Sequence, residues 1–154
     1  MQRIAHFIMI DAPVERVFAF VADYHNVPQM QAQFKSVRLL SAQERGLGAQ
    51  IEALGSFRGM PLTAQMTIIG FEEPRVLVSD STGGVRSRTT WRFDEQPGAG
   101  PDAAPRTRAA VVIEYEITIP GLSLLSGLVH RDVDNMTMDS LRRLKVLVEA
   151  SAEC

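Results

Sequence analysis

The feature that most restricts the fold is a run of strand-like segments from Ser36 to Ile119, followed by one long helical segment. In sequence letters these segments are SVRLLSA, AQIEALGSF, LTAQMTIIGF, RVLVSDS, VRSRTTWRFDE and TRAAVVIEYEITI. Turn signals lie between them at residues 46–48, 58–61, 72–74 and 83–84. Consecutive strands joined by tight turns form an antiparallel sheet, which usually presents one face to the core and the other to water. The pattern predicts an α+β fold.

One further strand and two short helices are predicted near the N-terminus. The segment RIAHFIMI alternates, and one face of this strand carries Ile4, His6, Ile8 and Ile10. Asp11 is expected to cap the helix that follows, with Pro13 in its first turn. Apolar residues then recur at helical spacing at Val14, Val17, Phe18 and Val21. The chain breaks at residues 26–28 and resumes as a second short helical turn, because Pro28 tolerates only the start of a helix.

The last segment, from about Leu122 to Ala150, is long enough for a helix of roughly 40 Å. Pro120 and Gly121 separate it from the preceding strand. The face that we expect to cover the sheet is a stripe formed by Val129, Val133, Met136, Ser140, Leu144 and Leu147. Between the last two strands, the segment QPGAGPDAAP is rich in proline, glycine and alanine. We expect it to be a mobile loop that carries no site.

The charges of the last two strands predict how these strands pair. When opposed residue numbers sum to 202, three attractive pairs form: Arg86–Glu116, Arg88–Glu114 and Asp94–Arg108. A sum of 200 would instead place Arg92 opposite Arg108, and like charges directly across a strand pair are unfavourable. We predict the first register. The arginines then form a solvated ion-pair face on the outside of the sheet, in preference to a site for an anionic ligand.

Composition argues against several classes of protein. The formal net charge of −2 provides no broad basic field, so general electrostatic binding of nucleic acid has little support. The apolar run near the N-terminus is short and flanked by charges, unlike a signal peptide or a transmembrane span. The one cysteine, Cys154, excludes an internal disulfide and a cysteine zinc cluster. A length of 154 residues fits one domain, and a reducing cytoplasm is the expected location.

The order of strand, two short helices, six strands and long helix, together with the segment IDAPVERVFAFVADYHNVPQM, resembles the START-like superfamily. This superfamily is also called SRPBCC or Bet v 1-like, and the group in it that the segment resembles is polyketide cyclase/dehydrase and lipid transport. The likeness covers about residues 3–150. It implies a helix-grip fold over a single domain, residues 1–154, in which a curved antiparallel sheet of about seven strands wraps around the C-terminal helix. It also implies a cavity between sheet and helix that binds lipids, sterols, isoprenoids, quinones or polyketides.

The inward-facing residues mix large apolar groups with few polar ones, which is typical of a small-molecule pocket. The same side chains are equally suited to filling a solid core. The residues expected to line the cavity and bind a ligand are His6, Phe57, Met66, Trp91, Phe93, Val111, Ile113, Tyr115, Val129, Val133, Met136 and Ser140.

Among these residues, His6 and Tyr115 are the candidates for acid–base chemistry. Both are expected to point inward, where they could orient a carbonyl or hydroxyl group of a ligand. The alternative is a core histidine and a core tyrosine whose polar atoms have protein partners. Ser140 has a similar pair of interpretations, since its hydroxyl could donate to a ligand or bond back to its own helix.

The segment VHRDVDNM suggests a metal site or an acid–base pair, because it places a histidine beside two alternating carboxylates. On a helix, His130 and Asp132 fall on opposite flanks of the buried stripe, and Asp134 lies further toward solvent. We expect at most a surface pair between His130 and Asp134. A metal ion needs three or more converging ligands, so no metal is predicted. The sequence also has no glycine-rich phosphate loop, so no nucleotide cofactor is predicted.

Three functions remain open on the sequence. The first is a non-enzymatic protein that binds a hydrophobic or amphipathic small molecule, such as a lipid, an isoprenoid or quinone, or a polyketide-like compound. The second is a cyclase or dehydratase without metal or nucleotide cofactor. The third is a protein or RNA interaction module that uses the outer arginines Arg86, Arg88, Arg92, Arg106 and Arg108. Exposed apolar edges are also compatible with a homodimer.

Overall fold

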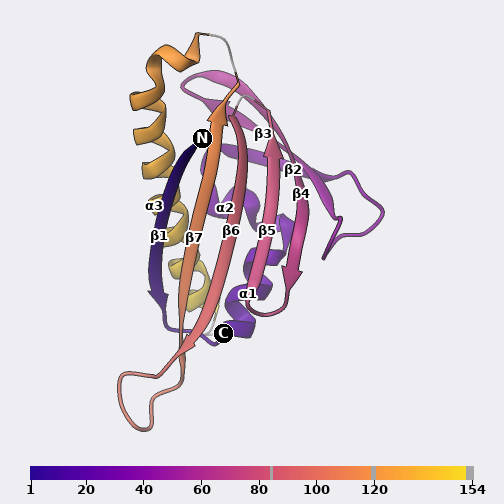
Figure 1. Ribbon diagram of the computed structural model, residues 1–154. Coiled ribbons are helices and arrows are strands. Elements are labelled where there is room, and N and C mark those ends of the chain that lie inside the picture. Colours follow the sequence, from indigo (N-terminus) through magenta and orange to yellow (C-terminus); the bar gives the residue numbers. More distant parts are fainter. Residues whose placement is uncertain (84, 119–120, 152–154) are drawn as a thin grey trace.

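The computed structural model describes residues 1–83, 85–118 and 121–151, and shows a curved antiparallel sheet with helices packed on its concave side (Figure 1). The elements in chain order are β1 (Gln2–Ile10), α1 (Val14–Ala22), η1 (Tyr24–Asn26), α2 (Val27–Met30), β2 (Phe34–Leu39), β3 (Gln50–Phe57), β4 (Met60–Glu72), β5 (Val76–Thr82), β6 (Val85–Gln96), β7 (Arg106–Ile117), η2 (Leu122–Leu125) and α3 (Ser126–Ser151). Gly84, Pro120 and Cys154, which were used in the sequence arguments, lie outside the described residues.

The strands form one seven-stranded sheet in the order β1-β7-β6-β5-β4-β3-β2. Every strand from β2 to β7 pairs with its neighbour in sequence, as the tight turns predict. The N-terminal strand β1 pairs with β7, the last strand. The predicted β6–β7 register is confirmed, because Arg86 faces Glu116 and Asp94 faces Arg108.

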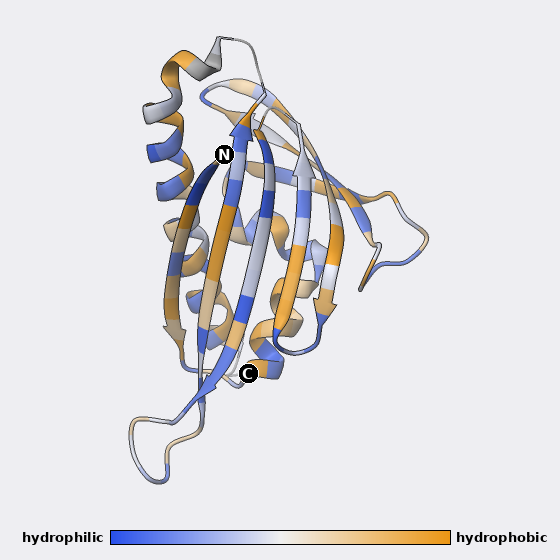
Figure 2. Ribbon diagram, in the orientation of Figure 1, coloured by the Kyte–Doolittle hydropathy of each residue, from blue (hydrophilic) through white to orange (hydrophobic). Residues whose placement is uncertain are grey.

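The predicted boundaries need small corrections, as two examples show. The strand expected at residues 36–42 is β2, which begins earlier, at the buried Phe34, and ends at Leu39. The helical segment expected from Leu122 begins as the short 3₁₀ helix η2 before α3 starts at Ser126. Alternation along the strands and along α3 is visible in Figure 2 as mixed hydrophobic and hydrophilic colours. Among the described helices, none is long and apolar enough to cross a membrane.

The main core lies between α1, the C-terminal half of α3 and the strands that they cover. Phe18 of α1 is fully buried, with its ring 5.2 Å from that of Phe71 and 5.7 Å from that of Phe93, both edge to face. The buried face of α3 consists of Val129, Val133, Thr137, Leu141, Leu144 and Val148. The predicted stripe is therefore partly wrong, because Met136, Ser140 and Leu147 are only half-buried.

The difference arises because, at each of these three places, the next residue along the helix takes the buried position. Leu141 is apolar and takes the core position next to the predicted Ser140. Thr137 is polar but can be buried, because its hydroxyl donates to the carbonyl of Val133 at 2.7 Å. Met136 and Ser140 then lie on the flank of the helix.

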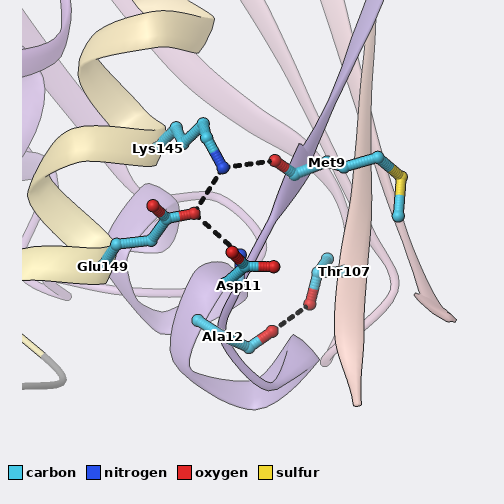
Figure 3. A network of polar contacts seen from close by, with 6 residues as sticks. All are labelled: Met9, Asp11, Ala12, Thr107, Lys145 and Glu149. Atoms are coloured by element: carbon cyan, nitrogen blue, oxygen red, sulfur yellow. Dashed lines mark hydrogen bonds and ion pairs between the residues drawn. The ribbon is translucent and has the colours of Figure 1, made fainter. Parts of the chain in front are cut away.

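A polar network holds the C-terminal part of α3 against the β1–α1 junction (Figure 3). The ammonium of Lys145 donates to the carbonyl of Met9 at 2.9 Å and to Glu149 at 2.5 Å. Glu149 also accepts from the backbone N–H of Asp11 at 2.8 Å. The prediction that Asp11 caps α1 is therefore wrong. Pro13 occupies the N-cap position without a side-chain cap, and Asp11 contacts α3 through its backbone.

We expect Phe18→Ala to lower the free energy of unfolding by about 3–5 kcal/mol, because it empties a fully buried aromatic position. Phe7→Ala is the matched control, since the Phe7 side chain is 56% exposed and packs on the guanidinium of Arg108. This control should cost less than about 1 kcal/mol. Urea denaturation measures both values. Similar losses in the two variants would contradict the assignment of Phe18 to the core.

The environment of Glu149 predicts a dependence of stability on pH. Burial alone would raise the pKa of Glu149, but the hydrogen bonds from Asp11 and Lys145, together with the Lys145 charge, lower it below its ordinary value. A lowered pKa stabilises the fold above the ordinary glutamate pKa of about 4.3, and this stabilisation is lost as the pH falls through the lowered value. Wild type should therefore exceed Glu149→Gln in stability near neutral pH, and the difference should shrink below about pH 4. A difference that does not change with pH would refute this role.

Candidate functional site

A cavity of about 210 Å³ lies between the concave face of the sheet and α3. Its wall is formed by side chains of β3 to β7 and α3, together with the residues that lead into β2. Most of the residues that were predicted to line a cavity are found in this wall: Phe57, Met66, Trp91, Val111, Ile113, Tyr115, Val133, Met136 and Ser140. The mixture of polar and apolar groups of a small-molecule pocket is thus present, although the volume lies below the roughly 300–1,000 Å³ typical of such sites.

Three predicted lining residues lie outside this wall. Phe93 is fully buried and stacks on Trp91 in the main core. Val129 is also buried, in a second apolar cluster with Ile4, Tyr115 and Val133. His6 faces α3 as predicted, but its Nε2 lies 2.6 Å from Oδ1 of Asp134. These positions correct the predicted lining, because Phe93 and Val129 pack behind residues of the wall and His6 contacts Asp134.

The lining changes from apolar to polar along the strands, row by row across β5, β6 and β7. One row consists of Trp91 and Val111, with Leu77 of the core beside them on β5. The next row consists of Ser79, Thr89 and Ile113. The third row consists of Ser81, Ser87 and Tyr115. Ser79, Ser81, Ser87 and Thr89 were not among the predicted site residues, although the alternation of RVLVSDS and VRSRTTWRFDE was a signal that could have identified them.

The cavity reaches the surface beside the β3–β4 turn. Met60 and Pro61 in this region line the cavity and are exposed, while Gln31 and Gln33 on the other side are half-buried. Gly55 allows this arrangement, because a Cβ at that position would lie 1.8 Å from the carbonyl oxygen of Gln33. That carbonyl instead accepts a hydrogen bond from the Ser56 N–H at 3.0 Å. Gly55 thereby lets the chain before β2 lie directly against β3 at the entrance.

A second cavity of about 80 Å³ lies next to the first, on the side of α1 and α2. The two cavities share four lining residues, Gln31, Met66, Ser79 and Trp91. These shared side chains form the partition between them.

The segment VHRDVDNM connects α3 to three separate parts of the sheet. Nδ1 of His130 forms a hydrogen bond of 2.7 Å with the hydroxyl of Tyr115 on β7. Asp132 accepts two hydrogen bonds, at 2.5 and 3.1 Å, from Arg58 in the β3–β4 turn. Asp134 pairs with His6 on β1. The predicted surface pair between His130 and Asp134 is therefore wrong, because each side chain has a partner on the sheet.

Tyr115 is the one lining residue with a titratable side chain among the described residues of the wall. Burial raises the pKa of its phenol, since the phenolate would be poorly solvated there. Its neighbour His130 is half-buried, and a hydrogen bond joins the phenol oxygen to Nδ1 of this histidine. No group of three or more potential metal ligands occurs among the described residues.

Tyr115→Phe should remove the component of alkaline titration that lies above the ordinary tyrosine pKa of about 10. The chain has two tyrosines, so the remaining signal in this variant comes from Tyr24. A raised pKa stabilises the fold below about pH 10, and that stabilisation is lost as the pH rises through the raised value. Tyrosinate absorbance measured against pH tests the expectation, with Tyr24→Phe as the control. A wild-type titration that Tyr115→Phe leaves unchanged would contradict it.

Comparison with solved structures shows the same fold at low sequence identity. TTHA0849 from Thermus thermophilus is 20% identical, with a TM-score of 0.75 over 97% of this chain and 99% of that one. The Zhui aromatase/cyclase from Streptomyces sp. R1128 is 16% identical, with a TM-score of 0.78 over 96% and 93%. A START superfamily protein from Mycobacterium smegmatis is 16% identical, with a TM-score of 0.62 over 98% and 97%.

Comparison of sequences identifies the family. No curated protein is significantly similar to the chain. Residues 1–149, however, match the family described as polyketide cyclase / dehydrase and lipid transport. This match covers nearly all of the sequence and agrees with the START-like fold of the solved structures. The chain is a member of the polyketide cyclase/dehydrase and lipid transport family.

Proposed function

We propose that the chain binds a neutral hydrophobic or amphipathic small molecule in the cavity between the sheet and α3. Candidate ligands are a lipid, an isoprenoid or quinone, and a polyketide-like compound. The observation that carries the proposal is the lining itself. The described wall residues include apolar side chains, hydroxyls and amides, but no aspartate, glutamate, lysine, arginine or histidine.

The uncharged wall restricts the ligand. Burying an ionised group without a charged or metal partner is strongly unfavourable, so an anionic or cationic headgroup would remain outside. The part of the ligand inside the cavity is therefore neutral. Trp91, Met66 and Met136 provide the polarisable apolar surface that such a ligand contacts.

A cyclase or dehydratase is the second candidate, favoured by the hydrogen bond between Tyr115 and His130. A phenol paired with an imidazole can donate and accept protons at the edge of the cavity. The aromatase/cyclase fold of the Streptomyces relative is compatible with this chemistry, although fold does not decide reaction. His6 does not support this candidate, since it contacts Asp134 and lies outside the wall. The acid–base candidates therefore reduce to Tyr115.

The interaction module receives less support. Arg88 makes a bidentate contact with Asp80, and Arg86 pairs with Glu116. The hydrogen bond from Arg88 is the main reason that the pKa of Asp80 is lowered. Arg108 packs on the ring of Phe7. The outer face thus satisfies much of its own positive charge, which leaves little attraction for a polyanion.

Native mass spectrometry of the freshly purified protein tests the proposed function directly, with extraction and identification of any retained compound. Ser140→Phe should abolish retention and weaken the uptake of neutral apolar probes by about tenfold or more, because the new ring enters the cavity. Val146→Phe is the matched control, since residue 146 is on the same helix, 65% exposed and outside the wall.

The result that would overturn the proposal is equally direct. If wild type takes up no neutral apolar probe, or if Ser140→Phe binds as well as Val146→Phe, the cavity is not the binding site. Thermal unfolding of both variants separates loss of binding from loss of folding.

A further inference from the structure

We propose that four hydroxyl groups on the sheet form a recognition surface for a ligand that carries several carbonyl or hydroxyl oxygens. The four residues, which we call the hydroxyl surface, are Ser79, Ser81, Ser87 and Thr89. This inference rests on the proposed function and specifies the chemistry of the ligand.

The hydroxyl surface has a regular geometry, because its members face one another on adjacent strands. Ser79 of β5 is opposite Thr89 of β6, and Ser81 is opposite Ser87. Neighbouring strands lie about 5 Å apart, and residues two apart on one strand are separated by about 7 Å. All four residues line the cavity. The wall therefore presents a compact array of hydroxyls on two adjacent inner strands of the sheet.

These hydroxyls are left without protein partners. None of the four side chains forms a hydrogen bond with another described residue. Each described buried polar side-chain atom does have a partner, so the four hydroxyls are not sealed in the core. Thr107 shows the contrast, since its fully buried hydroxyl donates to the carbonyl of Ala12. The hydrogen-bonding capacity of the hydroxyl surface is therefore free for a ligand or for water.

The rest of the wall adds directionality. Tyr115 continues the row that contains Ser81 and Ser87 onto β7, and Ser140 of α3 contributes one more hydroxyl that has no partner among the described residues. Val133 and Met136 of α3 add apolar surface. A ligand that fits this cavity has oxygens along one edge and an apolar body. A plain hydrocarbon chain would displace water from these hydroxyls and leave them unpaired, which disfavours it.

Two neutral probes of the same ring size test the inference: 2,7-dihydroxynaphthalene and naphthalene. We expect wild type to bind the dihydroxy probe more tightly than naphthalene in calorimetric titrations. Ser87→Ala and Thr89→Val should each weaken the dihydroxy probe about three- to tenfold and leave naphthalene unchanged or slightly tighter. Thr90→Val is the matched control, because Thr90 is the next residue on β6 and faces the opposite side of the sheet.

The outcomes separate the two proposals. If both probes bind equally well and the inward variants affect them alike, the hydroxyl surface is wrong while the cavity remains a binding site. If neither probe binds wild type, the proposed function fails and this inference fails with it. If Thr90→Val weakens the dihydroxy probe as much as Thr89→Val, the effect comes from the strand and not from the cavity, which also overturns the inference.

Discussion

The structure depends on the way in which α3 packs against the concave face of the sheet. Its C-terminal half makes apolar contact, because Leu141, Leu144 and Val148 join Phe18 in the main core. Its N-terminal half combines a smaller apolar cluster, in which Val129 and Val133 pack with Ile4 and Tyr115, with polar contacts. The polar contacts come from His130, Asp132 and Asp134. The cavity lies beside the middle of the helix, which lines it through Val133, Met136, Thr137 and Ser140.

This division explains why a small chain can maintain an internal cavity. An empty space removes packing contacts, and its cost is offset when the remaining core is complete. Here the main core and the network of Lys145 and Glu149 stabilise the C-terminal half of the helix. The N-terminal half is fixed by its smaller apolar cluster together with directional ion pairs and hydrogen bonds. The helix thus keeps its position although the space beside its middle is not filled by side chains.

Much of the fold could be predicted, because charge and alternation are local signals with spatial consequences. The β6–β7 register follows from pairing Arg86 with Glu116, and the inward sets of both strands follow from the same alternation. The predictions that failed concern interactions between elements distant in sequence. Asp134 is four residues from His130, but its partner is His6 on β1. Helical periodicity carries no information on which strand lies beside α3. The prediction therefore paired Asp134 with His130, the histidine nearest to it in the sequence.

The residues of the candidate site could likewise be predicted only in part, because packing between distant elements decides which of them line the cavity. Large side chains such as Trp91 and Met136 were expected in the wall and are found there, because size and inward direction are visible in the sequence. Phe93 meets the same criteria and lies in the solid core, since α1 covers that part of the sheet. Whether an inward-facing side chain lies in the core or lines the cavity depends on where the covering helix ends. That position is set by three-dimensional packing. Alternation places the small hydroxyl residues on the inner face, but it does not show which inner-face residues line a cavity, and they were therefore overlooked.

The partition between the two cavities has a consequence for the range of ligands. Met66 is one of the side chains that separate them, and a methionine has a flexible, unbranched side chain with several rotamers of similar energy. Rotation of this thioether changes the length of the available space without moving the backbone of the sheet. Trp91, which is part of the same partition, is fixed by stacking on Phe93. Under the proposed binding function, Met66 is thus the side chain whose rotamer would set the length of ligand that the chain accepts.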